Sequence, residues 1–280
     1  MMNNASNSIS IGLINFTNCL PINYTMEKWA LDDIILSWGH PVLINQLMKE
    51  GQVQVAPISA FEYLMNKDDY ILIKEACITS DAECGSVILF SNHKLEDLEG
   101  KTIALPHDSA TSINMLKIIL NEKGIPLENI NFIQHQYETP LKEALGKEFD
   151  AVLYIGDNAL VSRIKHKDKF YQYDLGKLWK DLTGLPPVFG AWVAKADWAA
   201  THKDDFDRLK FLINEAVEAG LGIYFNEVTQ KAASELDLNA DFIKDYLTAK
   251  IKYNFTPEHE KSLNLFKELY NKLNCHSIVS

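Results

Sequence analysis

Amide and hydroxyl side chains gather at four points of the chain, each directly after a short apolar run. The four segments are NFTNCLP (15–21), APISAFEYL (56–64), ALPHDSATSINML (104–116) and YIGDNAL (154–160). In open α/β sheets, ligands bind outside the carboxyl ends of the strands, where loops lead into helix N-termini. The four segments are therefore predicted to be strand-to-helix junctions that together hold a small anion.

The segment DSATS is the densest group of hydroxyls. Asp108, Ser109, Thr111 and Ser112 crowd the expected start of a helix, where unpaired backbone N–H groups and the helix dipole favour an anion. A carboxylate could dock there without an arginine. The alternative is that one of these residues simply caps the helix, and position alone favours neither interpretation.

Two other junctions carry similar alternatives. Ser59 followed by Glu62 forms a capping-box pattern, which favours a structural role, although Ser59 can also line the cleft. Gly156 would let a ligand approach the backbone closely, because it has no side chain. Asp157 could act as a general base, but N-capping of a helix from Asn158 is favoured.

The histidines and cysteines show no catalytic or metal-binding pattern. Of the eight histidines, only His107 stands beside a candidate site, and a surface loop position is expected for it. The four cysteines are scattered without metal-ligand spacing, so we expect reduced thiols. No G-x-S-x-G, H-E-x-x-H, P-loop or G-x-G-x-x-G motif occurs. We therefore expect neither a metal nor a cofactor.

Composition and charge restrict the classes of partner. The 280 residues have a formal net charge of −11, which disfavours nucleic acids and anionic membranes. Only two arginines, Arg163 and Arg208, are available as forked clamps for carboxylate or phosphate. The apolar runs are far shorter than the roughly 20 residues of a membrane span. The polar start lacks the pattern of a signal segment, so a cytoplasmic location is expected.

The elements that position the junctions alternate between strands and helices over the first two thirds of the chain. Apolar runs predict strands, and amphipathic segments between several of them predict helices. After PPVFGAWVAK the pattern is nearly continuous helix, and no internal repeat is apparent. The predicted strands are ISIGLI, DIILSW, VQVAPI, YILIKEACI, SVILFS, KTIALP, INFIQHQ and DAVLYIG.

This order predicts an α/β chain that leaves one lobe and later returns to it, with mixed sheets flanked by helices and a helical C-terminal segment. The crossings are expected near SVILFSNHKLEDLEGK and near LPPVFGAWVAK. The first lobe then comprises residues 9–95 and 190–280, and the second lobe comprises residues 96–189. With a ligand cleft between the lobes, this is the plan of the type II periplasmic-binding-protein-like fold.

The same junctions resemble those of the chorismate dehydratase family of the futalosine route to menaquinone. The matching segments follow one another in order and spacing over residues 9–195. One departure is Thr17, which stands directly before Asn18 where the family usually has leucine. The segments are INFTNCLPI, GQVQVAPISAFEYL, GSVILFS, LEGKTIAL, SATS, IGDNAL and YDLGKLWKDLTGLPPVFGAW.

The resemblance implies an enzyme that removes water from chorismate to give 3-[(1-carboxyvinyl)oxy]benzoate. Asn18 would be the catalytic residue and would present its amide to the substrate ring or its departing hydroxyl. A homodimer is compatible with this assignment. The substrate-binding residues would be Ser59, Ser86, Ser109, Thr111, Ser112, Gly156 and Asp157.

The implied reaction asks little of the protein. Chorismate is a dianion at neutral pH, because both carboxyls have pKa values of roughly 3 to 4. Aromatisation drives the loss of its hydroxyl, so orientation and help for the leaving group could suffice without a metal, a cofactor or a strong base. The substrate's own enolpyruvyl carboxylate could take the proton, which we state as a hypothesis.

Two rival functions stay open. The sister enzyme that forms 1,4-dihydroxy-6-naphthoate typically has Ile-His-Glu where this chain has Ile155, Gly156 and Asp157, and its Cys-Pro-Asn-Asp-like loop is missing here. The dehydratase is therefore favoured over the sister enzyme. A solute-binding protein for a small carboxylate would share the fold but would normally carry an export signal or a lipoprotein cysteine, and neither is seen.

Overall fold

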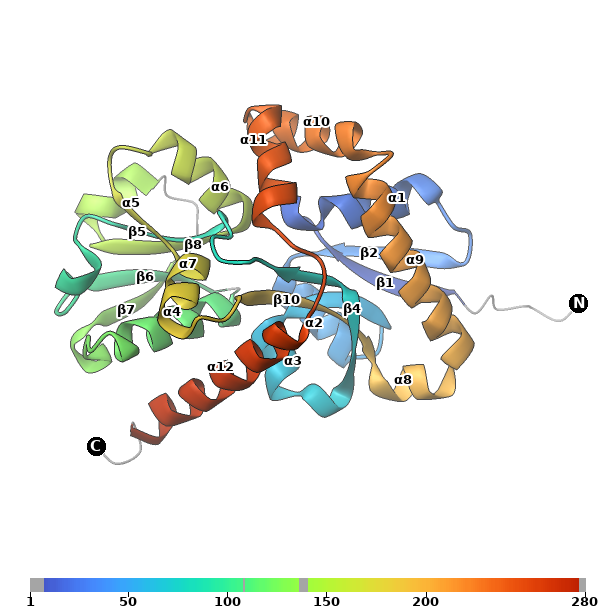
Figure 1. Ribbon diagram of the computed structural model, residues 1–280, viewed down its shortest axis with the longest axis horizontal. Coiled ribbons are helices and arrows are strands. Elements are labelled where there is room, and N and C mark those ends of the chain that lie inside the picture. The colour runs from blue at the N-terminus through green and yellow to red at the C-terminus, as the bar shows by residue number, and fades with distance from the viewer. Residues whose placement is uncertain (1–7, 108, 136–140, 277–280) are drawn as a thin grey trace, which may run out of the picture.

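The computed structural model describes residues 8–107, 109–135 and 141–276, which form two five-stranded sheets. The sheets lie side by side in Figure 1 and define two lobes. In spatial order, the first sheet consists of β2 (Ile34–Gly39), β1 (Ile9–Ile14), β3 (Val55–Ser59), β10 (Val188–Lys195) and β4 (Tyr70–Thr79). The second sheet consists of β7 (Asn131–His135), β6 (Thr102–Pro106), β8 (Ala151–Ile155), β5 (Val87–Ser91) and β9 (Tyr171–Asp174).

Both sheets have the same order of strands and the same mixture of directions. β1 runs parallel to β2 and β3, and β6 runs parallel to β7 and β8. One strand in each sheet, β10 in the first and β5 in the second, is antiparallel to both of its neighbours. The predicted fold class, with two lobes, mixed sheets and a helical C-terminal segment, is confirmed.

The lobe boundary differs from the sequence prediction at the first crossing. The sequence predicts residues 9–95 in the first lobe, but β5 pairs with β8 and β9 in the second sheet. The chain therefore crosses between Thr79 and Val87, upstream of the predicted boundary. A short apolar run predicts a buried strand without indicating which sheet it joins, and this explains the difference. The return before β10 falls close to the predicted position.

Helices follow most of the strands and pack against the sheets (Figure 1). In the first lobe α2 contacts β1, β2 and β3, whereas in the second lobe α5 and α6 contact β8. The bounds are α1 (Leu20–Trp29), α2 (Pro41–Lys49), α3 (Ala60–Met65), α4 (Ala110–Glu122), α5 (Leu141–Lys147), α6 (Gly156–Lys165), α7 (Leu175–Thr183), α8 (Ala196–Thr201), α9 (Lys203–Leu221), α10 (Phe225–Leu236), α11 (Ala240–Asp245) and α12 (Pro257–His276). Short 3-10 turns are η1 (Thr17–Cys19), η2 (Lys67–Asp69), η3 (Leu95–Asp97) and η4 (Leu127–Asn129).

The C-terminal region is helical, as predicted, but it is interrupted in two places. The nearly continuous helical pattern divides at Gly222, between α9 and α10, because glycine is a poor helix former. After α11 a π-helical turn, Tyr246–Lys250, leads toward α12, which contacts α3 and α4 and so touches both lobes. Among the described helices, none is long and apolar enough to cross a membrane.

One buried apolar cluster runs through both lobes. On β5, Val87 and Leu89 belong to this cluster, whereas Ile88 and Phe90 belong to a smaller cluster on the other face of the second sheet. This alternation follows from the two-residue period of a strand and shows that β5 is buried on both faces. The central strands are thus held rigidly, which fixes the loops at their ends.

Candidate functional site

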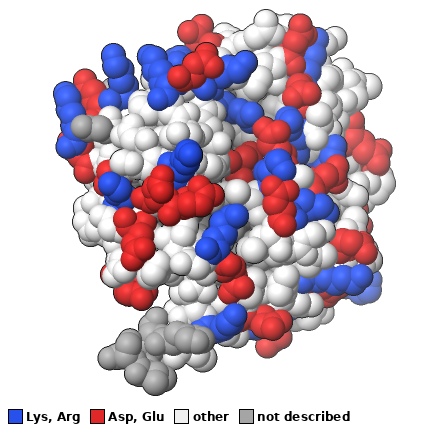
Figure 2. Space-filling view, turned by 60° about the vertical axis from the view of Figure 1, so that its left-hand side comes forward, with Lys and Arg blue, Asp and Glu red and all other residues white. Residues whose placement is uncertain are grey.

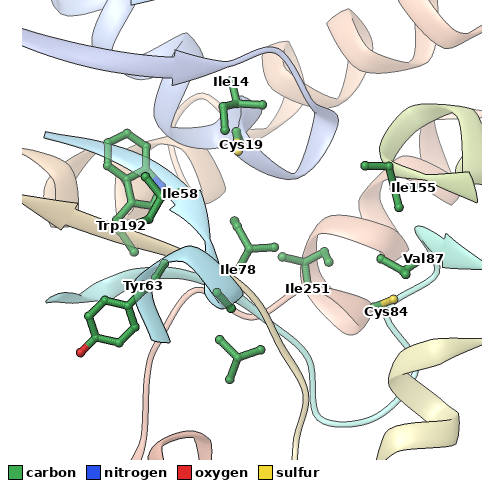
Figure 3. Close-up of a cluster of buried hydrophobic side chains, with 14 of the residues drawn as sticks. Ile14, Cys19, Ile58, Tyr63, Ile78, Cys84, Val87, Ile155, Trp192 and Ile251 are labelled. Atoms are coloured by element: carbon green, nitrogen blue, oxygen red, sulfur yellow. The ribbon is translucent and has the colours of Figure 1, made fainter. Parts of the chain in front are cut away.

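A cavity lies between the lobes, at the carboxyl ends of β1, β3 and β8. The space inside it that is open to water-sized molecules is about 100 Å³. Figure 3 shows apolar side chains from both sheets and from the C-terminal segment around it, namely Ile14, Ile58, Ile78, Val87, Ile155 and Ile251. Six of the residues predicted from the sequence line this cavity: Asn18, Ser59, Ser86, Ser109, Ser112 and Gly156.

The described residues that line the cavity include no charged side chain and no histidine. Arg163 pairs with Glu83 at 2.7 Å and Arg208 pairs with Asp33, so both arginines are engaged elsewhere. Acidic and basic side chains are instead interspersed over the surface, as Figure 2 shows for one face. His107 is exposed, as predicted. A bound anion would therefore meet hydroxyls, an amide and backbone N–H groups.

Asn18 lies in the turn η1 between β1 and α1. Pro21 in the first turn of α1 favours a helix start there, because its fixed φ suits that position. The backbone carbonyl of Asn18 accepts a hydrogen bond from the Tyr253 hydroxyl at 2.9 Å. The side-chain Oδ1 of Asn18 accepts one from Cys19 Sγ at 3.3 Å. Among the described residues Nδ2 has no hydrogen-bond acceptor, so this N–H group can donate to a ligand.

Ser86 stands just before β5, at the crossing between the lobes. The preceding Gly85 has a φ of +78°, a conformation that favours glycine. The Ser86 backbone carbonyl accepts from the N–H of Gly156 at 2.7 Å, and its Oγ is 2.9 Å from the Tyr246 hydroxyl. These contacts fix the Ser86 hydroxyl on the cavity wall.

The start of α4 presents two serines to the cavity. Ser109 is the N-cap residue, but its hydroxyl donates to Ser112 Oγ at 2.8 Å and accepts from no backbone N–H group of the helix. The capping alternative is thus not realised by Ser109, and among the described residues no side chain caps the first-turn N–H groups of α4. Asp108, the other candidate cap, lies outside the described residues.

Ser59 ends β3 and caps α3, as its capping-box pattern predicts. Its Oγ accepts from the N–H of Glu62 at 3.1 Å. The reciprocal half of the box is not formed, because the Glu62 carboxylate accepts instead from Asn66 at 2.9 Å and Tyr70 at 3.3 Å. Ser59 therefore has a structural role and also lines the cavity.

Thr111 and Asp157 do not line the cavity and instead form hydrogen bonds between the lobes. Thr111 Oγ1 accepts from the N–H of Phe61 in α3 at 3.0 Å. Asp157 Oδ1 accepts from the N–H of Thr17 in η1, also at 3.0 Å. Each bond joins a helix start of one lobe to a helix start of the other. Together they hold the lobes closed over the cavity.

The prediction that Asp157 caps a helix from Asn158 is wrong. α6 begins at Gly156, and Ile155 occupies the N-cap position without a side-chain cap. Gly156 has a φ of +56°, and a Cβ atom there would lie 2.9 Å from the ring of Phe16. Glycine thus permits the close approach of the two lobes. The pKa of the Asp157 carboxyl is raised, mainly by burial.

The cysteines are free thiols. Cys19, Cys77 and Cys84 are buried, and Cys275 is exposed. Burial raises the pKa of Cys19 and of Cys77 to about 12, so these two thiols stay protonated at neutral pH. No group of three or more His, Cys, Asp or Glu in the described part of the chain could hold a metal ion.

The sequence prediction missed four aromatic residues of the site. Phe16 and Phe189 line the cavity, and the place of Phe16 in the first junction was a usable signal. Tyr246 and Tyr253 belong to the C-terminal region and lie 160 and 235 residues along the chain from their partners Ser86 and Asn18. No local pattern predicts contacts of that range.

Solved structures with similar folds come from several organisms. A protein from Archaeoglobus fulgidus matches with a TM-score of 0.77 at 18% identity, covering 97% of this chain and 99% of that one. The alkanesulfonate-binding protein of Xanthomonas axonopodis pv. citri matches with a TM-score of 0.69 at 14% identity, covering 96% and 93%. At these identities the likeness concerns the fold alone. The fold and the cavity between the lobes define a periplasmic-binding-protein-like protein.

Within that class, the chain belongs to the menaquinone biosynthesis family, whose sequence model matches residues 9–272. A relative is the chorismate dehydratase of Thermus thermophilus, which is 26% identical over 272 residues, covering 92% of this chain and 93% of the relative. The family match extends past residue 195 and includes the helical C-terminal region, including Tyr246 and Tyr253.

Proposed function

We propose that the protein is a chorismate dehydratase, a hydro-lyase that converts chorismate to 3-[(1-carboxyvinyl)oxy]benzoate and water in futalosine-dependent menaquinone biosynthesis. Membership of the menaquinone biosynthesis family and the Thermus thermophilus relative support this function. The observation that carries it is a cavity between the lobes that offers an amide and several hydroxyls, with no charged side chain among its described lining residues. Such a lining suits a reaction driven by aromatisation.

The second lobe binds the substrate's carboxylates. α4 and α6 both start at the cavity wall, at Ser109 and Gly156, and neither start has a side-chain cap. Free N–H groups and the positive end of the helix dipole stabilise an anion at such a place. The hydroxyls of Ser109 and Ser112 add donors at the start of α4. A dianion is therefore bound without any arginine or lysine.

The reaction breaks one C–O bond and one C–H bond of the ring. The electron pair of the C–H bond forms the new ring double bond, and the hydroxyl leaves as water with the proton that the enolpyruvyl carboxylate has taken from the ring carbon. The Asn18 Nδ2 group donates to the departing oxygen and stabilises the negative charge that develops there. The described lining residues include no Asp, Glu, Lys or His, which supports the substrate's own enolpyruvyl carboxylate as the acceptor of the ring proton.

Closure of the lobes orients the substrate and keeps water away from it. The hydrogen bonds of Thr111 and Asp157 join the lobes, and most of the residues that line the cavity are apolar. Hydrogen bonds to the substrate are stronger in such a cavity than in water. A fixed orientation also places the enolpyruvyl carboxylate near the ring hydrogen that it removes.

Incubation of the purified protein with chorismate tests this function. Ultraviolet absorption follows formation of the aromatic ring, mass spectrometry identifies the product, and titration calorimetry measures binding. We expect product formation at a catalytic rate. Binding of chorismate without any product would favour a solute-binding protein. Consumption of a cyclised futalosine derivative, with chorismate untouched, would favour the sister synthase.

A further inference from the structure

The C-terminal segment between α11 and α12 runs past the cavity and contacts both lobes. It starts with the π-helical turn Tyr246–Lys250 and continues through Ile251, which lines the cavity. The backbones of Lys252 and Thr79 exchange two hydrogen bonds of 2.9 Å, which tie the segment to the end of β4. π-helical turns are rare and often occur at functional sites.

The first tyrosine of this segment, Tyr246, fixes the hydrogen bonding of Ser86. The Tyr246 side chain is only 1% exposed, and its hydroxyl has Ser86 Oγ, at 2.9 Å, as its partner. A buried phenol O–H must donate to avoid a large desolvation cost, and Ser86 is its acceptor among the described residues. The proton of the Ser86 hydroxyl is then free to point elsewhere, and the cavity is where a ligand can accept it.

The second tyrosine, Tyr253, fixes the backbone of Asn18. It is 6% exposed, and its hydroxyl donates to the Asn18 carbonyl at 2.9 Å. With the carbonyl held in this way and Oδ1 engaged by Cys19, the Nδ2 group of Asn18 is the part of the residue that remains available to a ligand. Tyr246 thus acts on the side-chain hydroxyl of Ser86, whereas Tyr253 acts on the backbone of Asn18.

Ion pairs anchor the π-helical turn to the rest of the site. Lys250, the last residue of the turn, pairs with Glu83 at 2.8 Å, and the same carboxylate pairs with Arg163 of α6 at 2.7 Å. Glu83 lies three residues before Ser86 in the crossing segment. The turn, the crossing segment and α6 therefore keep a fixed relation to one another.

We propose that Tyr246 and Tyr253 are positioning residues that orient the hydroxyl of Ser86 and the amide of Asn18 toward the substrate. This role rests on the proposed dehydratase function. Neither tyrosine lines the cavity. Tyr246 acts through Ser86 and Tyr253 acts through Asn18, and both of these residues line the cavity. The interrupted helix of the C-terminal region is, in this account, the device that brings both hydroxyls to the site.

Tyr246→Phe and Tyr253→Phe test the proposal, because each removes one hydroxyl and keeps the ring. We expect kcat on chorismate to fall by about 10- to 100-fold in each variant, the range found when outer partners of metal ligands are removed. KM should change by less than about threefold, since the carboxylate contacts of the second lobe are untouched. Tyr70→Phe is the matched control, because Tyr70 is also buried but its hydroxyl contacts Glu62.

Double-mutant cycles separate positioning from a general loss of stability. Tyr246→Phe should cause no further loss of kcat in a Ser86→Ala background, and Tyr253→Phe none in an Asn18→Ala background. Equal losses in both backgrounds, or wild-type kcat in the single variants, would overturn the proposal. Should Tyr246→Phe not fold, Lys250→Met replaces it, because it releases the turn from Glu83 and is expected to lower kcat at constant KM.

The wild-type protein, assayed first, tests the proposed function separately. If the wild type binds chorismate without turning it over, the dehydratase function fails, and the positioning role is then measured as weaker chorismate binding in the two tyrosine variants. Unchanged affinity in both variants would overturn it. Absence of both turnover and binding in the wild type would overturn both proposals.

Discussion

The two lobes share one strand order, but the helices that follow their equivalent strands β3 and β8 begin in different ways. After β3 in the first lobe, Ser59 caps α3 through the N–H of Glu62. After β8 in the second lobe, α6 starts at Gly156 without a side-chain cap, and no side chain of the described residues caps the start of α4 at Ser109. At a capped start, the side-chain hydroxyl accepts a hydrogen bond from a first-turn N–H group. At an uncapped start, the first-turn N–H groups can donate to a ligand.

This difference divides the work at the site between the lobes. In the proposed mechanism, the second lobe provides the positive ends of the α4 and α6 dipoles for the carboxylates. The first lobe provides Asn18, whose Nδ2 group would donate to the departing hydroxyl. Ser86 lies at the crossing between them. The proposal thus assigns binding to one lobe and catalysis to the other, depending on a few side chains at strand ends.

The largest effect is expected for the catalytic side. Asn18→Ala should lower kcat by about 10²- to 10³-fold, the loss seen when one oxyanion donor is removed, while the thermal midpoint stays within a few degrees. Asn15→Ala is the matched control, because Asn15 is an exposed amide of the same loop that does not line the cavity. Near-wild-type turnover in Asn18→Ala would remove this residue from the mechanism.

An intermediate effect is expected for the binding side, where the comparison of capped and uncapped serines can be tested directly. The double variant Ser109→Ala, Ser112→Ala should weaken chorismate binding by about tenfold or more, because hydrogen bonds to a charged group contribute about 1.5–3 kcal/mol. The thermal midpoint of this double variant should stay unchanged.

The capped serine provides the contrast. Ser59→Ala should lower the free energy of unfolding by about 1 kcal/mol, the usual value of an N-cap, with a smaller change in chorismate affinity. Calorimetric titration and thermal unfolding measure both quantities. If the double variant Ser109→Ala, Ser112→Ala is less stable while its chorismate affinity is unchanged, these serines have the same structural role at α4 that Ser59 has at α3.

The smallest effect concerns the hydrogen bonds between the lobes. Burial raises the pKa of the Asp157 carboxyl, so the folded protein keeps this proton to a higher pH than the unfolded chain does. Its contribution to stability is fully present below the unfolded pKa of about 3.9 and is lost as the pH rises through the folded pKa. Asp157→Asn is neutral at every pH and keeps an acceptor for Thr17.

The thermal midpoint of Asp157→Asn should therefore exceed that of the wild type at neutral pH and equal it below about pH 3.9. The gain should stay below about 4 °C, since 1 kcal/mol moves the midpoint of a protein near this size by about 2–4 °C. Asp168→Asn, at an exposed position of the same lobe, should show no shift. A lower midpoint in Asp157→Asn at neutral pH would mean that the charge itself holds the lobes together.

The sequence predicts the strands well where they are apolar. The eight predicted strands are present, but β9 and β10 are not among them. β9, with the sequence YQYD, was missed because its polar residues give no apolar run, and the β10 segment VFGAWVAK was predicted only as a crossing between the lobes. The sheet to which β5 belongs could not be predicted either, since pairing is a long-range property. The repeated strand order of the two lobes is likewise a matter of pairing and leaves no repeat in the sequence.

The candidate site is predictable at strand ends and nowhere else. Asn18 follows β1 at the edge where the parallel strands end, and Ser86 reaches the same edge because the antiparallel strand β5 starts there, opposite the end of β8. The roles of Thr111 and Asp157 depend on which way a first-turn side chain points, and residue type does not determine this. The contribution of Tyr246 comes from a remote helix, so only the folded chain shows it.

The central claim, that an uncharged cavity suffices for dehydration, is tested most directly by chorismate turnover after exhaustive dialysis against a chelator, measured from pH 5 to pH 8. We expect the product 3-[(1-carboxyvinyl)oxy]benzoate to form at the rate of untreated protein, with no inflection near about 6.5, the ordinary value of histidine. His107→Asn should be equally active. Turnover that disappears with the chelator, or a folded but inactive His107→Asn variant, would contradict the account.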